Sequence, residues 1–376
     1  MPVTCHSDPA LREKNPSSSY DLANAGILRR PDKIGTPQDD ILGDLSASFQ
    51  EVKVEYRTLP KTGLKVSRLS FGTMTFGAQT DPATAQRMVE CYLDAGINFF
   101  DTANVYNRGA AETILGKALK GRRDKVVLAS KVRGKMGDAP DDEGLSRAAL
   151  RKALDASLER LGTDYLDLYY LHQPDYAVPV EETLDTMQEL VRAGKVRFPA
   201  VSNYAAWQVC EILWICEKRA YQPYFISQPM YNLLARGIEE EYLPFCQRFG
   251  VAVVPYNPLA GGLLTGKHSR ERAPLPGTRF DGNKMYQDRY WHDDDFAAVE
   301  ELRTIAREAG KTLVELALQW LLAQPLVDSI ILGASRAEQL EENLKAAEGA
   351  RLEASFLSRC DLVWKRLRGI APKYNR

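Results

Sequence analysis

The feature that most constrains this chain is a regular alternation of short apolar runs with longer amphipathic stretches, which begins near residue 54. The runs are rich in Val, Ile, Leu, Phe and Tyr and lack strict polar alternation, as expected for strands that are covered on both faces. We expect strands at 68–71, 97–101, 125–131, 165–172, 196–202, 225–228, 251–256 and 329–332.

Helical patterns separate these runs, and several of them stop at a glycine that opens the next strand, as Gly96, Gly194 and Gly250 do. Glycine readily adopts the left-handed conformation that ends a helix and turns the chain. The expected helices are 82–95, 111–119, 146–161, 180–193, 205–219, 238–249, 295–309, 312–323 and 336–347.

Eight strands alternating with helices predict an α/β protein with a parallel sheet, and eight is the number that closes a (β/α)8 TIM barrel. The alternative is an open doubly wound sheet, but the Gly-x-Gly-x-x-Gly turn that such a sheet uses to bind dinucleotides is missing from the sequence. Residues 1–50 contain scattered prolines, serines and acidic residues and predict a mobile N-terminal tail, so that 51–376 form a single barrel.

Charge and composition exclude several classes of function. The charges of the 49 basic and 50 acidic residues nearly cancel, so the chain has no general attraction to nucleic acid. The sequence contains no run of about 18 apolar residues, so we expect no membrane span. The chain has few residues that could bind a metal ion: its six cysteines form no Cys-x-x-Cys pair, and it has only four histidines. We therefore expect no metal site. With no N-terminal targeting signal, we expect a cytoplasmic protein; a homo-oligomer is left open.

Three consecutive expected strands end in a residue with reactive chemistry: Asp101, Lys131 and His172. Neighbouring barrel strands place such residues at one opening, where a buried lysine needs a partner such as Asp101. Tyr106 follows in the next loop, and a nearby ammonium would lower the pKa of its phenol from about 10 and let it donate a proton. The alternative is a structural ion pair beside a surface tyrosine and a core histidine.

Further polar residues follow the later strands. Ser202, Asn203 and Gln228 could bracket a carboxamide, and the helix start at 333–336 lies where barrels bind phosphate. The segment 261–267 imitates an NTPase phosphate loop, but His268 stands where Ser or Thr should bind magnesium, and the prolines after it prevent the long helix that should follow.

One segment, 100–106, reads Phe-Asp-Thr-Ala-Asn-Val-Tyr and is followed by Glu112 and Gly116; Gly333-Ala334-Ser335 and Glu338-Gln339-Leu340 come later. On these motifs the chain resembles the aldo-keto reductase superfamily from about residue 56 to 367, and within it the branch of the voltage-gated potassium channel β subunits and bacterial reductases. The resemblance implies a (β/α)8 barrel that uses NADP(H) to reduce aldehydes or ketones. It implies a tetrad in which Tyr106 is the general acid, Lys131 tunes it, Asp101 holds the lysine and His172 positions the carbonyl.

The resemblance also implies where ligands bind. The residues expected to bind NADP(H) are Thr73, Met74, Gln79, Asp101, Ser202, Asn203, Gln228, Tyr256, Asn257, Pro258, Leu259, Gly261, Lys267, Arg279, Gly333, Ser335, Arg336, Gln339, Glu342 and Asn343. The residues expected around a small carbonyl substrate are Met74, Tyr106, Arg133, Trp207, Met230 and Tyr231. Their side chains favour medium-sized aldehydes or ketones, and Arg133 leaves acidic ones open.

Two departures from the family pattern affect these expectations. Pro199 lies inside an expected strand, where it removes a hydrogen-bond donor and puts the local geometry in doubt. Asn257 stands where Ser is more usual. The rival function is a non-catalytic NADP-binding regulator like the channel β subunits, which carry Asn where this chain has His172, so the complete tetrad favours an enzyme.

Overall fold

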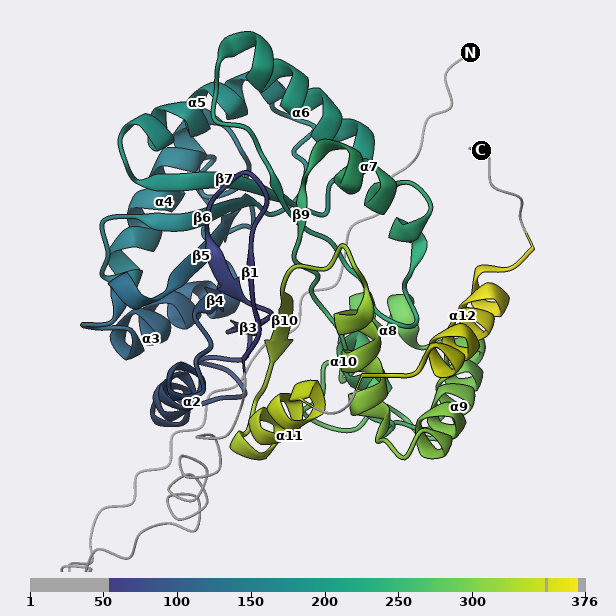
Figure 1. The fold of residues 1–376 in the computed structure, drawn as a ribbon. Helices are drawn as coiled ribbons and strands as arrows, with labels where there is room; N and C mark the ends of the chain where they lie inside the picture. Colours follow the sequence, from purple (N-terminus) through teal and green to yellow (C-terminus); the bar gives the residue numbers. More distant parts are fainter. Residues whose placement is uncertain (1–53, 349–350, 371–376) are drawn as a thin grey trace, which may run out of the picture. The chain divides into compact units, whose positions relative to one another are not determined.

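The computed structural model describes residues 54–348 and 351–370. Eight parallel strands follow one another in the order β10-β3-β4-β5-β6-β7-β8-β9 (Figure 1). Backbone hydrogen bonds from Asp328 to Val253 (2.9 Å) and from Ile331 to Pro255 (3.0 Å) join the last segments and close the sheet. The predicted (β/α)8 barrel is therefore confirmed. Its strands are β3 (Leu69–Gly72), β4 (Phe99–Asp101), β5 (Val127–Val132), β6 (Leu166–Leu171), β7 (Val196–Ser202), β8 (Ile226–Gln228), β9 (Ala252–Val253) and β10 (Ile330–Gly333).

Helices connect the strands, largely where the sequence predicts them. The helix expected at 238–249 begins later, at Tyr242, because Gly237–Glu239 forms a separate 3-10 turn. Two helices, α8 (Lys284–Tyr290) and α12 (Ala354–Arg368), were not predicted. The others are α2 (Pro82–Asp94), α3 (Ala110–Ala118), α4 (Arg147–Leu161), α5 (Val180–Arg192), α6 (Ala206–Arg219), α7 (Tyr242–Phe249), α9 (Asp293–Glu308), α10 (Leu313–Ala323) and α11 (Ala337–Glu348).

Local sequence explains how individual helices begin and end. Thr312 and Glu315 form a capping box at the start of α10, in which each side chain accepts a hydrogen bond from the other residue's backbone N–H. At the other end of a helix, Gly250 takes the left-handed conformation after α7, as its position in the sequence predicts.

Two hydrophobic cores lie on the two faces of the sheet. The inner core fills the barrel with side chains such as Phe99, Ala129 and Tyr170. The outer core packs the helices against the strands and includes their chain neighbours, such as Phe100 and Leu171. Successive residues of a strand therefore face the lumen and the helices in turn.

A hairpin that was not predicted, β1 (Tyr56–Thr58) and β2 (Lys65–Ser67), adds to the inner core. Its residues Leu59, Leu64 and Val66 pack among the lumen side chains. Side chains of the hairpin region also contact residues that precede strands: Lys61 donates to the carbonyl of Phe249, and Ser67 accepts from the backbone of Asn98. The hairpin thus covers the N-terminal ends of the strands and leaves the C-terminal ends for a site.

Pro199 does not interrupt its strand. β7 runs from Val196 to Ser202, and Pro199 pairs in register with Tyr169 of β6. The tail predicted at 1–50 lies outside the described residues. Within the described ranges, no helix combines the length and the apolar character needed to cross a bilayer.

Candidate active site

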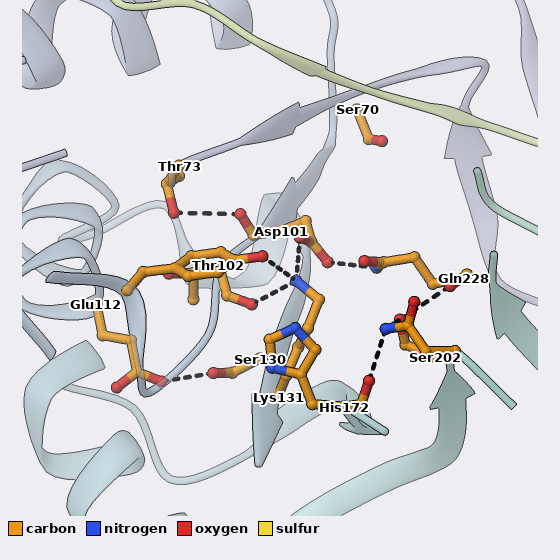
Figure 2. A network of polar contacts seen from close by, with 12 residues as sticks. Ser70, Thr73, Asp101, Thr102, Glu112, Ser130, Lys131, His172, Ser202 and Gln228 are labelled. Carbon is orange, nitrogen blue, oxygen red and sulfur yellow. Dashed lines mark hydrogen bonds and ion pairs between the residues drawn. The ribbon is translucent and has the colours of Figure 1, made fainter. Parts of the chain in front are cut away.

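The alternation of each strand decides which polar side chains enter the lumen. In β5, Lys131 shares its face with the lumen residue Ala129, whereas Ser130 points outward and donates to Glu112 of α3 (Figure 2). Asp101 likewise shares its face with Phe99, and His172 directly follows β6. The structure thus brings the ends of β4, β5 and β6 together, as the sequence predicts.

Lys131 and Asp101 form a direct ion pair with exposed fractions of 0% and 2%. The ammonium also donates to the carbonyl of Thr102 at 2.9 Å and contacts the phenol oxygen of Tyr106 at 3.3 Å. The second carboxylate oxygen of Asp101 accepts a hydrogen bond from Gln228 at 2.8 Å (Figure 2). Burial lowers the pKa of Lys131, but the charges and hydrogen bonds of Asp101 and Tyr106 outweigh it, so the pKa lies above its ordinary value and the lysine stays charged.

Tyr106 is held in place by an unusual turn. The next two residues, Asn107 and Arg108, have positive φ angles of 48° and 53°. The Asn107 amide donates to the carbonyls of Met74 (3.1 Å) and Phe76 (2.6 Å), which ties this turn to the loop after β3. The side-chain hydrogen bonds of asparagine make it one of the residues that tolerate the left-handed region.

The sequence-based expectation for the Tyr106 pKa is wrong. Burial raises the pKa of the phenol above its ordinary value, and the opposing charge of Lys131 does not overcome this. The phenol is therefore protonated at neutral pH, and the ammonium beside it is placed to stabilise the phenolate once a proton has left.

His172 lies across from this phenol. Its ring is edge-on to the Tyr106 ring, with the centroids 6.1 Å apart. Burial, followed by the charges of Lys131 and Arg133, lowers the pKa of His172 to about 3. The imidazole is neutral at neutral pH and can donate or accept a hydrogen bond without carrying charge.

A cavity of about 690 Å³ begins at Asp101 and Tyr106 and extends to the start of α11. Most residues expected to bind the cofactor line it: Met74, Gln79, Asp101, Gln228, Tyr256, Asn257, Pro258, Leu259, Gly261, Lys267, Arg279, Gly333, Ser335, Arg336, Gln339, Glu342 and Asn343. This agreement is greatest in the loops after β9 and β10.

Three expected cofactor residues are not among those that line the cavity, and their side chains form hydrogen bonds between neighbouring strand ends instead. Thr73 donates to the carbonyl of Asp101 at 3.2 Å, and Ser202 donates to that of Gln228 at 2.9 Å. Asn203 donates to the carbonyl of His172 at 2.8 Å and accepts from the Tyr256 hydroxyl at 2.7 Å.

Sequence reasoning missed Tyr286, which lines the cavity from α8. A Cβ atom on Gly261 would lie 2.8 Å from the Tyr286 ring, so the glycine is needed for the two segments to approach. The sequence signal for α8 is weak. Asn283 is a typical residue to cap a helix, but the helix that follows has only seven residues and is too short to show a clear pattern.

Three cations gather in the same cavity: Lys267, Arg279 and Arg336. Burial, then the charges of Arg336 and Arg279, lower the pKa of Lys267. Among the described ion pairs, none joins these three side chains to a carboxylate. Clustered cations that form no ion pair with a described carboxylate favour an anionic ligand, so the residues present fit a dinucleotide with its phosphates.

The segment that imitates an NTPase loop has a different structure. Ala260–Thr265 forms a 3-10 turn, and the next helix begins only at Lys284. His268 is buried between the rings of Phe280 and Trp291, with centroids 5.0 and 5.3 Å away. The strand–loop–helix arrangement of an NTPase site is not formed here.

Of the residues expected around the substrate, Met74 and Tyr106 line the cavity, and the other four are not among its lining residues. Arg133 pairs with Glu143, and Trp207 is exposed in the first turn of α6. Met230 accepts a hydrogen bond from the Tyr290 hydroxyl at 3.1 Å. Tyr231 is fully buried with its hydroxyl on Glu239 and its ring against Trp320, so the structure does not bring it to the cavity.

A model of the Aldo/keto reductase family matches residues 68–365. The chain belongs to the aldo/keto reductase family. A human relative named Aldo-keto reductase family 7 member A3 is 36% identical and covers 81% of this chain and 96% of its own length.

Two other relatives of this aldo/keto reductase are named for different functions, one as an oxidoreductase and one as a channel subunit. A Bacillus subtilis protein named Uncharacterized oxidoreductase YrpG is 40% identical over 78% of this chain and 91% of its own length. A protein from Arabidopsis thaliana named Probable voltage-gated potassium channel subunit beta is 38% identical over 78% of this chain and 92% of its own length. The family thus includes relatives named as reductases and relatives named as channel subunits.

Proposed function

We propose that this aldo/keto reductase is an NADPH-dependent oxidoreductase that reduces small aldehydes or ketones to alcohols. The observation that carries the proposal is the contact of the Lys131 ammonium with Asp101 on one side and with the Tyr106 phenol on the other, at the edge of the cavity. NADPH supplies the hydride when bound.

The chain's own residues manage the proton. Tyr106 donates its phenol proton to the substrate oxygen, and Lys131 stabilises the phenolate that remains. Asp101 keeps the ammonium in place, because a lysine buried to this extent needs a counter-charge. His172, neutral at working pH, helps to orient the carbonyl with a hydrogen bond.

The preference for NADPH over NADH rests on three cations that form no ion pair within the part of the chain that the structure describes. Lys267, Arg279 and Arg336 provide more positive charge than a single pyrophosphate needs, which suits an additional phosphate. Ser335 and Gln339 hydrogen-bond each other at 3.1 Å beside Arg336 and add polar groups at the same end.

The substitution Tyr106→Phe tests the proposal. It removes one hydroxyl and keeps the ring, so NADPH affinity should stay close to that of the wild type while turnover falls at least ~100-fold, the contribution of a general acid. NADPH binding by fluorescence titration and absorbance loss with a panel of aldehydes and ketones measure the two effects.

The alternative function, a non-catalytic NADP-binding subunit that regulates a channel, is favoured by the name of the Arabidopsis relative. The same measurements separate the two functions. Tight NADPH binding by the wild type without turnover of any carbonyl would support the regulatory subunit. Turnover that Tyr106→Phe leaves unchanged would show that another group donates the proton.

A further inference from the structure

Glu112 is a buried carboxylate to which the proposed reaction assigns no role. It stands in the first turn of α3 and has an exposed fraction of 0%. One of its oxygens accepts a hydrogen bond from the Ser130 hydroxyl of β5, and the other accepts from Nε of Arg160, in the last turn of α4, at 2.7 Å. A charge is buried at low cost only when it is paired and hydrogen-bonded, and Glu112 is both. Glu112 thus links two helices to one strand on the outer side of the barrel wall.

The contact with Ser130 lies directly behind Lys131. The two residues are neighbours in β5, so their side chains leave opposite faces of the strand. Lys131 enters the lumen and meets Asp101 and Tyr106, whereas Ser130 is held from outside by Glu112 (Figure 2). This hydrogen bond therefore fixes the part of β5 from which the ammonium extends.

The contact with Arg160 reaches the turn that carries Tyr106. Gly109 ends this turn with a φ angle of 88°, and a Cβ atom there would lie 2.7 Å from Cδ of Arg160. The glycine is thus needed for the arginine to lie against the turn. The guanidinium is fixed in that place by Glu112 and by the Ser157 hydroxyl, which accepts from Nη2 at 3.3 Å. Arg160 in this way supports the backbone three residues after the phenol.

Close packing keeps Glu112 between these two contacts. Gly116 follows Glu112 by one turn of α3, and a Cβ atom on it would lie 2.5 Å from the carbonyl oxygen of Leu161, the last residue of α4. The backbones of α3 and α4 therefore touch at this point, and a close-packed interior of this kind resists a relative shift of the helices. The carboxylate is a fixed point between β5 and the turn of Tyr106.

We propose that Glu112 is a positioning residue that sets the 3.3 Å contact between the Lys131 ammonium and the Tyr106 phenol. It acts through Ser130 on the strand of the lysine and through Arg160 on the turn of the tyrosine. Glu112 is not among the residues that line the cavity, so its effect on the reaction is indirect. The ammonium stabilises a phenolate less as the two groups separate, so a looser contact slows proton donation. The inference rests on the proposed reductase function and extends it to residues outside the cavity.

The test is Glu112→Gln in the full-length protein, with NADPH and para-nitrobenzaldehyde. Glutamine keeps the size of the side chain and leaves Arg160 without the carboxylate that fixes it. Turnover should fall about ten- to a hundredfold, the effect of displacing a reacting group by up to about 1 Å. The NADPH dissociation constant and the KM of the aldehyde should stay within about twofold of the wild type, because Glu112 does not line the cavity. Turnover is expressed per NADPH-binding site, counted by titration, so an unfolded fraction does not lower it.

The dependence on the phenol is tested in a second background. Tyr106→Phe has no phenol to position, so adding Glu112→Gln should change its residual turnover by less than about twofold. Equal losses in the wild type and in Tyr106→Phe would overturn the inference, because Glu112 would then act on something other than the phenol.

Asp167 provides the matched control at the opposite end of the strands, as the second residue of β6. Its exposed fraction is 1%, and it pairs with Arg123 at 2.8 Å and with Arg197 at 2.6 Å. It also accepts from the backbone N–H of Leu128 in β5 at 3.0 Å. Asp167→Asn therefore removes a paired, buried carboxylate and should lower the free energy of unfolding at least as much as Glu112→Gln does, while turnover per site stays within about twofold of the wild type.

The remaining outcomes separate the positioning role from the reductase function. Turnover that Glu112→Gln leaves unchanged, or lowers no more than Asp167→Asn does, would overturn the positioning role while the reductase function stands. A rise in the NADPH dissociation constant as large as the fall in turnover would also overturn it, because the whole site would then be distorted. Failure of the wild type to reduce any aldehyde or ketone would instead count against the proposed function.

Ser130→Ala decides the question if Glu112→Gln does not fold. It removes one hydroxyl from the strand of Lys131 and keeps the pair of Glu112 with Arg160. Turnover per site should fall about threefold or more, with the NADPH dissociation constant and the KM unchanged. Turnover equal to that of the wild type would overturn the inference.

Discussion

Two lysines of one site have pKa values shifted in opposite directions. Lys131, bonded to Asp101 and Tyr106 at the cavity edge, has a pKa above its ordinary value because its partners outweigh burial. Lys267, which lines the same cavity, has a pKa below its ordinary value because of burial and the charges of Arg336 and Arg279. One ammonium is neutralised inside the protein, and the other lies among like charges.

The difference shows how a protein can use the same side chain in two ways. An ammonium that is paired within the fold cannot be removed alone without leaving a buried carboxylate unpaired, and it can take part in every reaction cycle because its counter-charge is always present. An ammonium grouped with other cations makes the free protein slightly less stable and favours an anion from outside, whose binding then stabilises the folded state.

The largest test of this comparison is Lys131→Met. Removing the ammonium leaves Asp101 buried without its counter-charge, which should lower the free energy of unfolding by about 3–5 kcal/mol and lower turnover more than ~100-fold. Urea unfolding and carbonyl reduction measure the two effects.

The double variant Asp101→Asn/Lys131→Met is the control for that test. It removes both charges, so it should recover part of the lost stability without recovering turnover. Equal stability of the single and double variants would show that the two charges are not coupled.

The sequence predicted the barrel and the meeting of Asp101, Lys131 and His172 at one end of it, because both depend on patterns within single strands. Apolar runs that end in Asp101, Lys131 or His172 reveal the strands and the polar ends, and the barrel geometry then brings these ends together. The hairpin was missed because its strands have only three residues each and the pattern of β1 is mostly exposed.

Features that depend on packing between distant segments were not predicted. Tyr231 follows a strand as the pocket residues do, but Trp320 and Glu239 hold it in the core, and no local pattern reports this. The direction of the Tyr106 pKa shift was missed for a similar reason: the charge of Lys131 can be inferred from the strand order, whereas the degree of burial requires the packed structure.

The next test addresses the other lysine. Lys267→Met should leave the free energy of unfolding without NADPH unchanged or slightly higher, in contrast to Lys131→Met, because it removes a cation that is repelled by Arg279 and Arg336. NADPH affinity should fall about ten- to a hundredfold, and less at high salt, because a charge-assisted contact is lost. Titration calorimetry at two salt concentrations measures this.

Lys284 supplies the control for this test. It is an 84% exposed lysine of α8 that pairs with Asp288, so Lys284→Met should change NADPH affinity little. A loss of unfolding free energy in Lys267→Met comparable to that in Lys131→Met would remove the distinction between the two lysines.

The smallest effect is a pH dependence that comes from His172. Its pKa is about 3 in the folded protein and about 6.5 in the unfolded chain, so between these values the unfolded chain binds more protons. The free energy of unfolding should therefore fall as pH drops below about 6.5, by at most about 1.4 kcal/mol per pH unit from this group. His172→Asn lacks this dependence, so wild type and variant should differ by a constant amount above pH 7 and by a changing amount below it.

The difference between the two proteins isolates His172, because His268, whose pKa is lowered to about 4, contributes equally to both. Urea unfolding at intervals from pH 7.5 to 4.5 measures the difference, and the wild type should lose stability faster on the acid side. If the difference stays constant over that range, His172 titrates near its ordinary pKa in the folded protein. An imidazolium would then stand beside Lys131 near neutral pH and compete with Tyr106 as the proton donor, and the assignment of a single paired cation to the chemistry would fail.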